Sequence, residues 1–299
     1  MNVTPRRLLT AALAALVMGA THAETIDLST PEGATLANRK VQCSTVDGKP
    51  VFYMWSGTAW GRRAGEADKM LFRVTGMNVR TCGTLEDPVR GTGWRQVSRE
   101  IMVYQDPRTG EIVDEWENPY TGKTVKVLHV ENDPVNGRPN YPRNAEGEPA
   151  GRFWGQPSGD QWLMNVTVPL FYHNVLQGDY QRYVGGAYHA TEMFNFSGPL
   201  EDLTDGDRDT AQATVGWVRV AQWLPWMEMQ GRDGTMYAHA IGRKLSGWDE
   251  LPDILKTYIE ERAPKYKEPP PVDDDRKNET SWTYFLKMVE GEELPRGGH

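Results

Sequence analysis

The fold class is decided by the stretch Trp94-Arg-Gln-Val-Ser-Arg-Glu-Ile-Met-Val-Tyr-Gln105, in which β-branched and aromatic residues recur without helical spacing. Such a run predicts a β-strand. It ends at Asp106-Pro-Arg-Thr-Gly110, whose early proline and closing glycine are typical of a hairpin turn. The stretch Asn118-Pro-Tyr-Thr-Gly-Lys123 repeats the same pattern. The region therefore predicts antiparallel strands joined by short turns.

Both faces of the Trp94 to Gln105 strand are mixed in polarity. Alternate side chains of a strand share a face, and one face here carries Trp94, Gln96, Ser98, Glu100, Met102 and Tyr104. A second run repeats the mixture, with Tyr188, Glu192, Phe194 and Phe196 on one face. A sheet with one core face and one wet face alternates cleanly, whereas mixed faces are typical of a barrel around an aromatic-lined cavity. A misjudged register would give the same mixture.

The chain as a whole is predicted to be mainly β, an antiparallel barrel-like meander of about nine strands with one or two short C-terminal helices. A β-sandwich is the alternative. The expected strands are Val51–Trp60, Met70–Arg80, Trp94–Gln105, Glu111–Glu117, Thr124–Glu131, Gln161–Val168, Ala187–Phe196, Thr214–Trp223 and Met236–Arg243. Helical spacing is expected only after residue 248, from Asp249 to before Pro264 and from Glu279 to Glu290.

The N-terminus has the pattern of a cleavable export signal. Arg6 and Arg7 precede an apolar run from Leu8 to Met18, and Thr21-His-Ala23 supplies a small-x-small cleavage site. The run is too short to span a bilayer, and no later stretch is long and uncharged enough. We therefore expect a periplasmic or secreted protein with no membrane span after cleavage. The paired arginines leave the general and the twin-arginine export routes both open.

The remaining chain divides into a large domain and a short tail. About 276 residues follow the signal, a length that suits one large β domain. We assign residues 1–23 to the signal peptide, 24–263 to a single β-rich domain, and 264–299 to a proline-rich and acidic joint with a C-terminal helix.

Charge and cysteine content exclude several classes of site. The 33 basic and 41 acidic residues give a formal charge of −8, which argues against a nucleic-acid partner. Two cysteines, Cys43 and Cys82, are too few for a thiolate-rich zinc or iron–sulfur site. They either form one disulfide or remain free thiols.

Aromatic and methionine residues are abundant, with 11 Trp, 12 Tyr, 7 Phe and 12 Met. Rings with a polar edge suit a pocket for a flat hydrophobic ligand, although large rings also fill an ordinary barrel core. Trp223 and Trp226 flank Pro225, which indicates a strand end, where the mouth of a barrel is built. The ring-bearing candidates for ligand binding are Trp55, Tyr104, Tyr188, Trp223 and Trp226.

His129 and Glu131 are the leading catalytic candidates, because they lie two residues apart on a predicted strand and so share a face. His189 is a third catalytic candidate, and Arg219 and His239 are expected to support binding. His129, His189 and His239 come from separate strands and would suit a divalent metal if those strands converge, with Glu131 or Glu192 as a further ligand. No His-x-His or His-x3-His spacing supports a metal, so isolated histidines are favoured. No nucleotide-binding, phosphate-binding or serine-hydrolase motif is present, and no cofactor is expected.

The sequence thus favours a periplasmic protein whose aromatic-lined cavity acts on a small hydrophobic or aromatic molecule by acid/base chemistry, as in a lyase, hydratase or isomerase. The alternatives are a non-catalytic, lipocalin-like carrier of such a molecule and a structural envelope protein with a solid core. A polar centre deep in the cavity would favour the first. A wholly apolar cavity, or His129 and Glu131 facing outward, would favour the carrier.

Four phrases together are distinctive: Asn118-Pro-Tyr-Thr-Gly-Lys123, His129-Val-Glu-Asn-Asp-Pro-Val-Asn136, Gln222-Trp-Leu-Pro-Trp-Met227 and Ser281-Trp-Thr-Tyr-Phe285. In these the chain resembles a bacterial family known as domain of unknown function 1838, over most of its length after the signal. The resemblance implies export, in agreement with the N-terminal pattern. It implies no catalytic residue or substrate.

Overall fold

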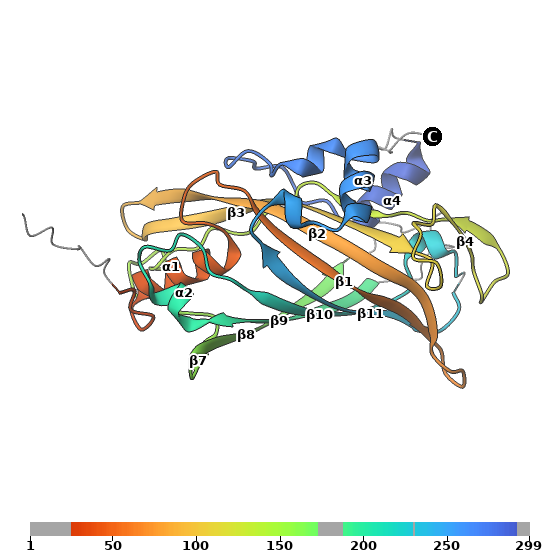
Figure 1. Ribbon diagram of the computed structural model, residues 1–299, viewed down its shortest axis with the longest axis horizontal. Helices are drawn as coiled ribbons and strands as arrows, with labels where there is room; N and C mark the ends of the chain where they lie inside the picture. Colours follow the sequence, from red (N-terminus) through yellow and green to blue (C-terminus); the bar gives the residue numbers. More distant parts are fainter. Residues whose placement is uncertain (1–24, 173–187, 230, 292–299) are drawn as a thin grey trace, which may run out of the picture.

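The computed structural model describes residues 25–172, 188–229 and 231–291 (Figure 1). The expected signal peptide lies outside these residues. The helices are α1 (Pro31–Gln42), α2 (Leu200–Thr204), α3 (Asp253–Arg262) and α4 (Ser281–Glu290), with short 3-10 helices η2 (Pro225–Met227), η3 (Trp248–Glu250) and η4 (Pro264–Lys267). The strands are β1 (Val51–Arg62), β2 (Lys69–Asp87), β3 (Gly91–Gln105), β4 (Glu115–Glu117), β5 (Thr124–Lys126), β6 (Val130–Asn132), β7 (Gln156–Ser158), β8 (Gln161–Tyr172), β9 (Tyr188–Pro199), β10 (Thr214–Ala221) and β11 (Thr235–Leu245).

Nine of these strands form one antiparallel sheet in the order β6-β3-β2-β1-β11-β10-β9-β8-β7. The predicted fold class, a mainly β antiparallel meander, is confirmed. The sheet curls strongly, so that β2 and β3 lie over β9 and β10 as a second layer in Figure 1. It stops short of a closed barrel, because β6 and β7 each pair on one side only within the described residues.

Seven of the nine predicted runs lie in this sheet, and the other two need correction. The runs 111–117 and 124–131 mostly form a separate hairpin of β4 and β5, closed by the predicted turn at Asn118–Lys123. The second run then supplies only the short edge strand β6, beside β3. Edge strand β7 was not predicted, because it is three residues long and has a central proline.

Helix α1 was also not predicted, and the expectation of no helix before residue 249 is wrong. Its N-terminal signal is nevertheless present in the sequence, because the Thr30 side chain caps the helix by accepting from the Gly33 N–H at 3.1 Å, and Pro31 follows at the first helical position. The apolar face of α1 is short and small-sided, with Ala37 and Val41 packed against the sheet. The two predicted C-terminal helices are confirmed as α3 and α4.

The mixed polarity of β3 has a structural explanation on both of its faces. Ile101 and Val103 point to the convex side, where α3 and η4 cover them through Leu255, Ile259 and Tyr266. The alternate residues point to the concave side. Since neither face of the strand is open to bulk solvent, the simple inside–outside alternation is lost.

Both ends of the curled sheet are filled. At one end α1 and α2 pack on Tyr53 and Trp162, and Leu203 is the buried apolar residue of α2 in this cluster. At the other end η2, the β4–β5 hairpin and α4 bury a cluster that includes Trp226 and Phe285. Only the middle of the concave face is left unfilled.

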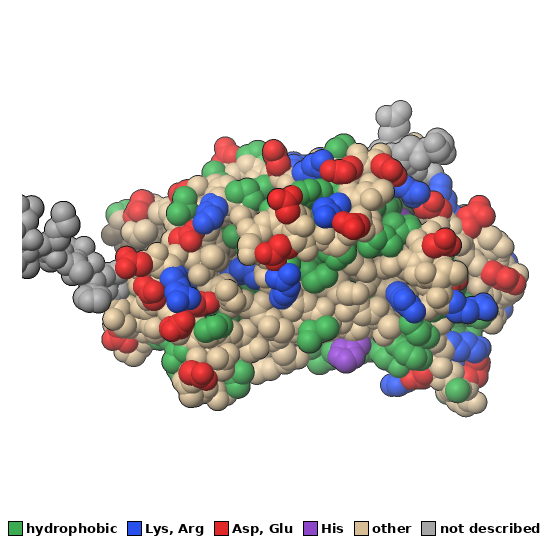
Figure 2. Space-filling view, in the orientation of Figure 1, with side chains coloured by type: hydrophobic (Ala, Val, Ile, Leu, Met, Phe, Trp, Pro, Cys, Tyr) green, Lys and Arg blue, Asp and Glu red, His purple; other side chains and the backbone are tan. Residues whose placement is uncertain are grey.

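A disulfide joins Cys43, directly after α1, to Cys82 on β2, with 5.9 Å between the two Cα atoms. It fixes the C-terminal end of α1 against the sheet, beside Trp94. Among the helices in the described ranges, none is long and apolar enough to cross a membrane. Acidic and basic side chains are interspersed over the face of the molecule in Figure 2.

Candidate active site on the concave face of the sheet

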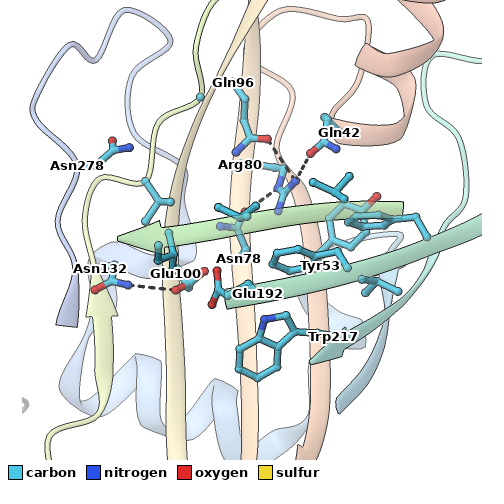
Figure 3. Close-up of a pocket in the computed structure, with 18 of the residues that line it drawn as sticks. Gln42, Tyr53, Asn78, Arg80, Gln96, Glu100, Asn132, Glu192, Trp217 and Asn278 are labelled. Atoms are coloured by element: carbon cyan, nitrogen blue, oxygen red, sulfur yellow. Dashed lines mark hydrogen bonds between the residues drawn. The ribbon is translucent and has the colours of Figure 1, made fainter. Parts of the chain in front are cut away.

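A cavity of about 1070 Å³ occupies the middle of the concave face. Its walls come from β1, β2 and β3 on one side and from β8, β9 and β10 on the other. A volume of this size suits a small organic ligand, and such sites combine apolar walls with a few polar groups. Figure 3 shows 18 of the lining residues.

Two carboxyl groups, which come from opposite walls, lie close together in this cavity. Glu100 projects from β3 and Glu192 from β9, and Figure 3 shows their carboxyl groups side by side. Four strands separate β3 from β9 in the sheet order, so the curl of the sheet brings the two groups together. The charge of Glu192 in turn helps to raise the pKa of Glu100.

Glu100 sits in an environment that favours its protonated form. Burial within the protein raises the pKa of Glu100 to about 7, and the nearby charge of Glu192 acts in the same direction. Asn132 Nδ2 donates to Glu100 Oε1 at 3.1 Å, and this hydrogen bond opposes the rise. The side chain is half-buried because it lines the cavity. Glu100 can therefore exchange a proton near neutral pH.

Glu192 has a cationic neighbour on the adjacent strand. Arg219 lies directly opposite it in the β9–β10 ladder, and Arg219 Nη1 is 3.8 Å from Glu192 Oε1. Val168 lies opposite Glu192 on its other side, in β8. The ionised form of Glu192 thus has a counter-ion inside the cavity wall. In the described part of the chain, Glu100 has an amide donor within hydrogen-bonding distance, and the charges of Arg219 and Arg80 oppose the rise of its pKa from farther away.

A second arginine, Arg80, lies in the same wall and is held by neutral groups. Its Nε donates to Asn78 Oδ1 at 2.6 Å, and its Nη1 donates to Gln42 Oε1 at 2.7 Å and to Gln96 Oε1 at 3.3 Å (Figure 3). Its guanidinium carbon lies 4.7 Å from the centre of the Tyr53 ring. Burial lowers the pKa of Arg80 below its usual value.

Aromatic rings form much of the remaining wall. Trp55 and Trp217 meet with ring centres 6.3 Å apart, and Phe194 stacks on Phe196 at 6.0 Å. Gly76 makes room for the Trp55 indole, because a Cβ at Gly76 would lie 2.6 Å from Trp55 Cε2. These rings offer flat apolar contact surface beside the carboxyl groups.

The cavity opens between the two edges of the sheet. Exposed lining residues mark the mouth: Arg138, which follows β6, Arg152 and Trp154, which precede β7, and Asn278, which precedes α4. The gap left by the unclosed sheet is therefore the route to the carboxyl pair.

The structure places the predicted pair His129 and Glu131 elsewhere. They share a face, as expected, but it is the convex face, because Glu131 lies opposite Ile101 in the β3–β6 ladder while Val130 and Asn132 point into the cavity. This corrects the expectation that the pair lines the cavity.

The side chains of His129 and Glu131 both contact Tyr258 on α3. Tyr258 Oη donates to Glu131 Oε1 at 2.7 Å, and its ring meets the His129 ring edge-on at 5.3 Å. The Tyr104 N–H donates to His129 Nδ1 at 3.2 Å. Burial raises the pKa of Glu131 to about 6, although the Tyr258 hydrogen bond opposes the rise. The pair fastens α3 to the sheet.

The other predicted site residues divide between the cavity wall, the core and the surface. Trp55 and Arg219 line the cavity, while Tyr104, Trp223 and Trp226 are buried in the cluster that fills one end of the sheet. That cluster is core and not the mouth expected at Trp223 and Trp226. The Tyr188 side chain lies outside the described part of the structure.

The predicted histidines do not gather. His189 and His239 are exposed on the sheet, whereas His129 is buried under α3. Within the described residues no group of three or more His, Cys, Asp or Glu side chains is arranged to hold a metal ion.

Sequence reasoning missed Glu100 and Arg80 as site candidates, and it considered Glu192 only as a further ligand of a metal. The signal for Glu100 and Glu192 was present, since both lie on the mixed faces that predicted a cavity. The pattern that would have identified Glu100 and Glu192 is an acidic residue on the same strand face as several aromatic residues. Arg80 ended a predicted strand, and nothing in the sequence indicated that β2 continues past it to Asp87.

Comparison with protein families gives one assignment. The family described as a protein of unknown function, DUF1838, matches residues 48–289, so the chain belongs to this family and the resemblance seen in the sequence is confirmed. The match includes Glu100, Glu192, Arg219 and Arg80. A search of curated proteins found no match.

Proposed function

We propose that this DUF1838 protein binds a small hydrophobic or aromatic molecule in the concave cavity and moves a proton on it by means of Glu100 and Glu192. The observation that supports the proposal is the pairing of two carboxyl groups, one with a raised pKa, inside an aromatic-lined cavity with a mouth. The earlier choice of His129 and Glu131 for this role is withdrawn, because α3 covers them.

The two carboxyl groups have distinct environments and therefore distinct proposed roles. Glu192, paired with Arg219, is the base that removes a proton from the ligand, and protonated Glu100 is the acid that delivers one. In an isomerisation one proton leaves one carbon and another returns elsewhere. In a dehydration the delivered proton leaves with the hydroxyl group as water. Either reaction balances without an added oxidant, reductant or nucleotide.

A carrier that binds without reacting is the second candidate. It is favoured by the aromatic rings that make up so much of the wall and by the position of His129 and Glu131 outside the cavity. In that case Glu100 and Glu192 would orient a polar group of the cargo and no bond would change. A solid structural core, the third expectation, is not proposed further because the concave face contains a cavity.

We further propose that the protein works after export, in the periplasm or outside the cell. The disulfide between Cys43 and Cys82 supports this, since such bonds persist in oxidising compartments.

The catalytic proposal is tested on the molecule that native mass spectrometry finds bound to mature protein from its own host. That molecule is released, returned to fresh protein in D2O, and followed by NMR. Deuterium incorporation or conversion by the wild type, lost in Glu100→Gln while binding remains, is expected. Binding with no exchange or conversion by either protein would refute catalysis and leave the carrier.

A further inference from the structure

The cavity has a charged group that the proton-transfer proposal leaves unused, the guanidinium of Arg80. All of its hydrogen-bond partners within the described residues are the neutral amide oxygens of Asn78, Gln42 and Gln96. No carboxylate in that part of the chain lies within 4.0 Å of it, in contrast to Arg219 with Glu192 at 3.8 Å. Within the described residues Arg80 is thus a cation in the cavity wall with no carboxylate in contact. The charge of Glu100, diagonally across the β2–β3 ladder, acts on it only from a distance.

A cation with no counter-ion in contact is costly, because the more distant charge of Glu100, whose protonated form is favoured, repays little of the desolvation of the guanidinium group. That cost is seen in the lowered pKa of Arg80, whose largest cause is burial. The protein nevertheless holds the group rigidly, with side chains from α1, β2 and β3 around it and the Tyr53 ring against its face. Such an arrangement is preorganised for an incoming anion.

One nitrogen of Arg80 remains available for that anion. The hydrogen bonds of Arg80 use Nε and Nη1, and Nη2 donates to no group of the described chain. Arg80 also lines the cavity, so a ligand inside it can reach the guanidinium. Lys244 Nζ lies 5.4 Å from the centre of the Tyr53 ring, but burial lowers the pKa of Lys244, and its Nζ already donates to Lys40 O and Thr210 Oγ1.

The position of Arg80 relative to Glu100 sets the geometry of such a ligand. Asn78 lies directly opposite Glu100 in the β2–β3 ladder, and Arg80 is two residues further along β2 on the same face. Diagonal neighbours of this kind lie roughly 7 Å apart. An anion on Arg80 therefore holds the adjacent carbons of the same molecule close to Glu100.

We propose that Arg80 binds a carboxylate of the ligand, so that the cavity binds a small aromatic or hydrophobic carboxylic acid more tightly than its neutral counterpart. This inference rests on the proposed function and specifies its substrate class. The charged group anchors the molecule at Arg80, the rings of Trp55 and Trp217 contact its flat part, and the carboxyl pair reaches its carbon atoms.

Isothermal titration of the mature protein with two matched probes, 2-naphthoate and 2-naphthalenemethanol, tests the assignment. They share the ring system and differ in charge. We expect wild-type protein to bind naphthoate about tenfold to a hundredfold more tightly, which is the range of a charge-assisted hydrogen bond. Arg80→Gln should remove this preference, and Arg80→Lys should restore part of it.

Arg73→Gln is the matched control, because Arg73 lies on the same strand with an exposed side chain and does not line the cavity. It should leave both affinities unchanged. Equal affinities for the two probes in the wild type would overturn the role of Arg80 and leave the cavity as a binding site. A preference that survives in Arg80→Gln would also overturn it, and binding of neither probe would overturn both proposals. The wild-type comparison holds even if an Arg80 variant fails to fold.

Discussion

Replacing Glu100 by glutamine should stabilise the protein at alkaline pH and leave its stability unchanged in acid. Raising the pKa of a carboxyl group from 4.5 to about 7 costs its ionised form about 3 kcal/mol, since each pH unit corresponds to about 1.4 kcal/mol. The glutamine keeps an oxygen to accept from Asn132 Nδ2 but has no charge to desolvate.

The sign follows from proton linkage. Between pH 4.5 and about 7 the folded protein keeps the Glu100 proton while the unfolded chain loses it, so Glu100 lowers the free energy of unfolding as the pH rises. Above about pH 7 its contribution stays constant. The free energy of unfolding of Glu100→Gln relative to wild type should therefore increase by up to about 3 kcal/mol between pH 4.5 and pH 8.

Urea unfolding of both proteins at pH 4.5, 6 and 8 measures this difference, and other titrating groups cancel in it. Glu111→Gln, at an exposed position after β3, is the control and should give a difference near zero at every pH. A Glu100→Gln difference that does not grow with pH, or that falls, would refute the description of Glu100 as a desolvated carboxyl group facing a second one.

Three further results are expected. Tyr258→Phe removes the hydroxyl group that donates to buried Glu131, so it should lower the free energy of unfolding by about 1–3 kcal/mol above pH 6 and by less below pH 6. Naphthoate binding in the cavity should stay unchanged in this variant. Loss of naphthoate binding would contradict the separation of His129 and Glu131 from the cavity. Replacing Cys43 and Cys82 by serine should lower the free energy of unfolding by about 4 kcal/mol, because the unfolded chain gains the entropy that the disulfide removes. The midpoint of urea unfolding measures this loss, and reduced wild-type protein should match the double variant. Mature protein from its own host should have the intact mass of a chain that begins at Glu24, and retention of the residues before it would contradict the export proposal.

The sequence predicted the strands well because their signals are local. Turn residues at Asp106 to Gly110 and Asn118 to Lys123 mark hairpins whatever the rest of the chain does, and both turns form. The mixed faces of β3 and β9 also predicted a cavity, which exists. These properties depend on neighbours in sequence and on the two-residue period of a strand.

The site residues were harder to predict because they depend on contacts between distant strands. His129 and Glu131 look like an acid/base pair in isolation, but the β3–β6 register turns them toward α3. Glu100 and Glu192 are 92 positions apart in the chain and meet only because the sheet curls. No local pattern encodes either the register or the curl, so the face that encloses the cavity could not be distinguished from the face beneath a helix.

Titration of the fluorescent neutral probe N-phenyl-1-naphthylamine into three proteins tests most directly whether the concave cavity is the binding site. Val168 lies opposite Glu192 in the cavity wall, so Val168→Trp should fill that space and abolish saturable binding. Val220→Trp adds the same bulk where the native side chain is 40% exposed and away from the cavity, and it should bind like wild type. Saturable binding to wild type and Val220→Trp but not to Val168→Trp is the predicted result. Binding that survives in Val168→Trp, or is absent from wild type, would contradict the account.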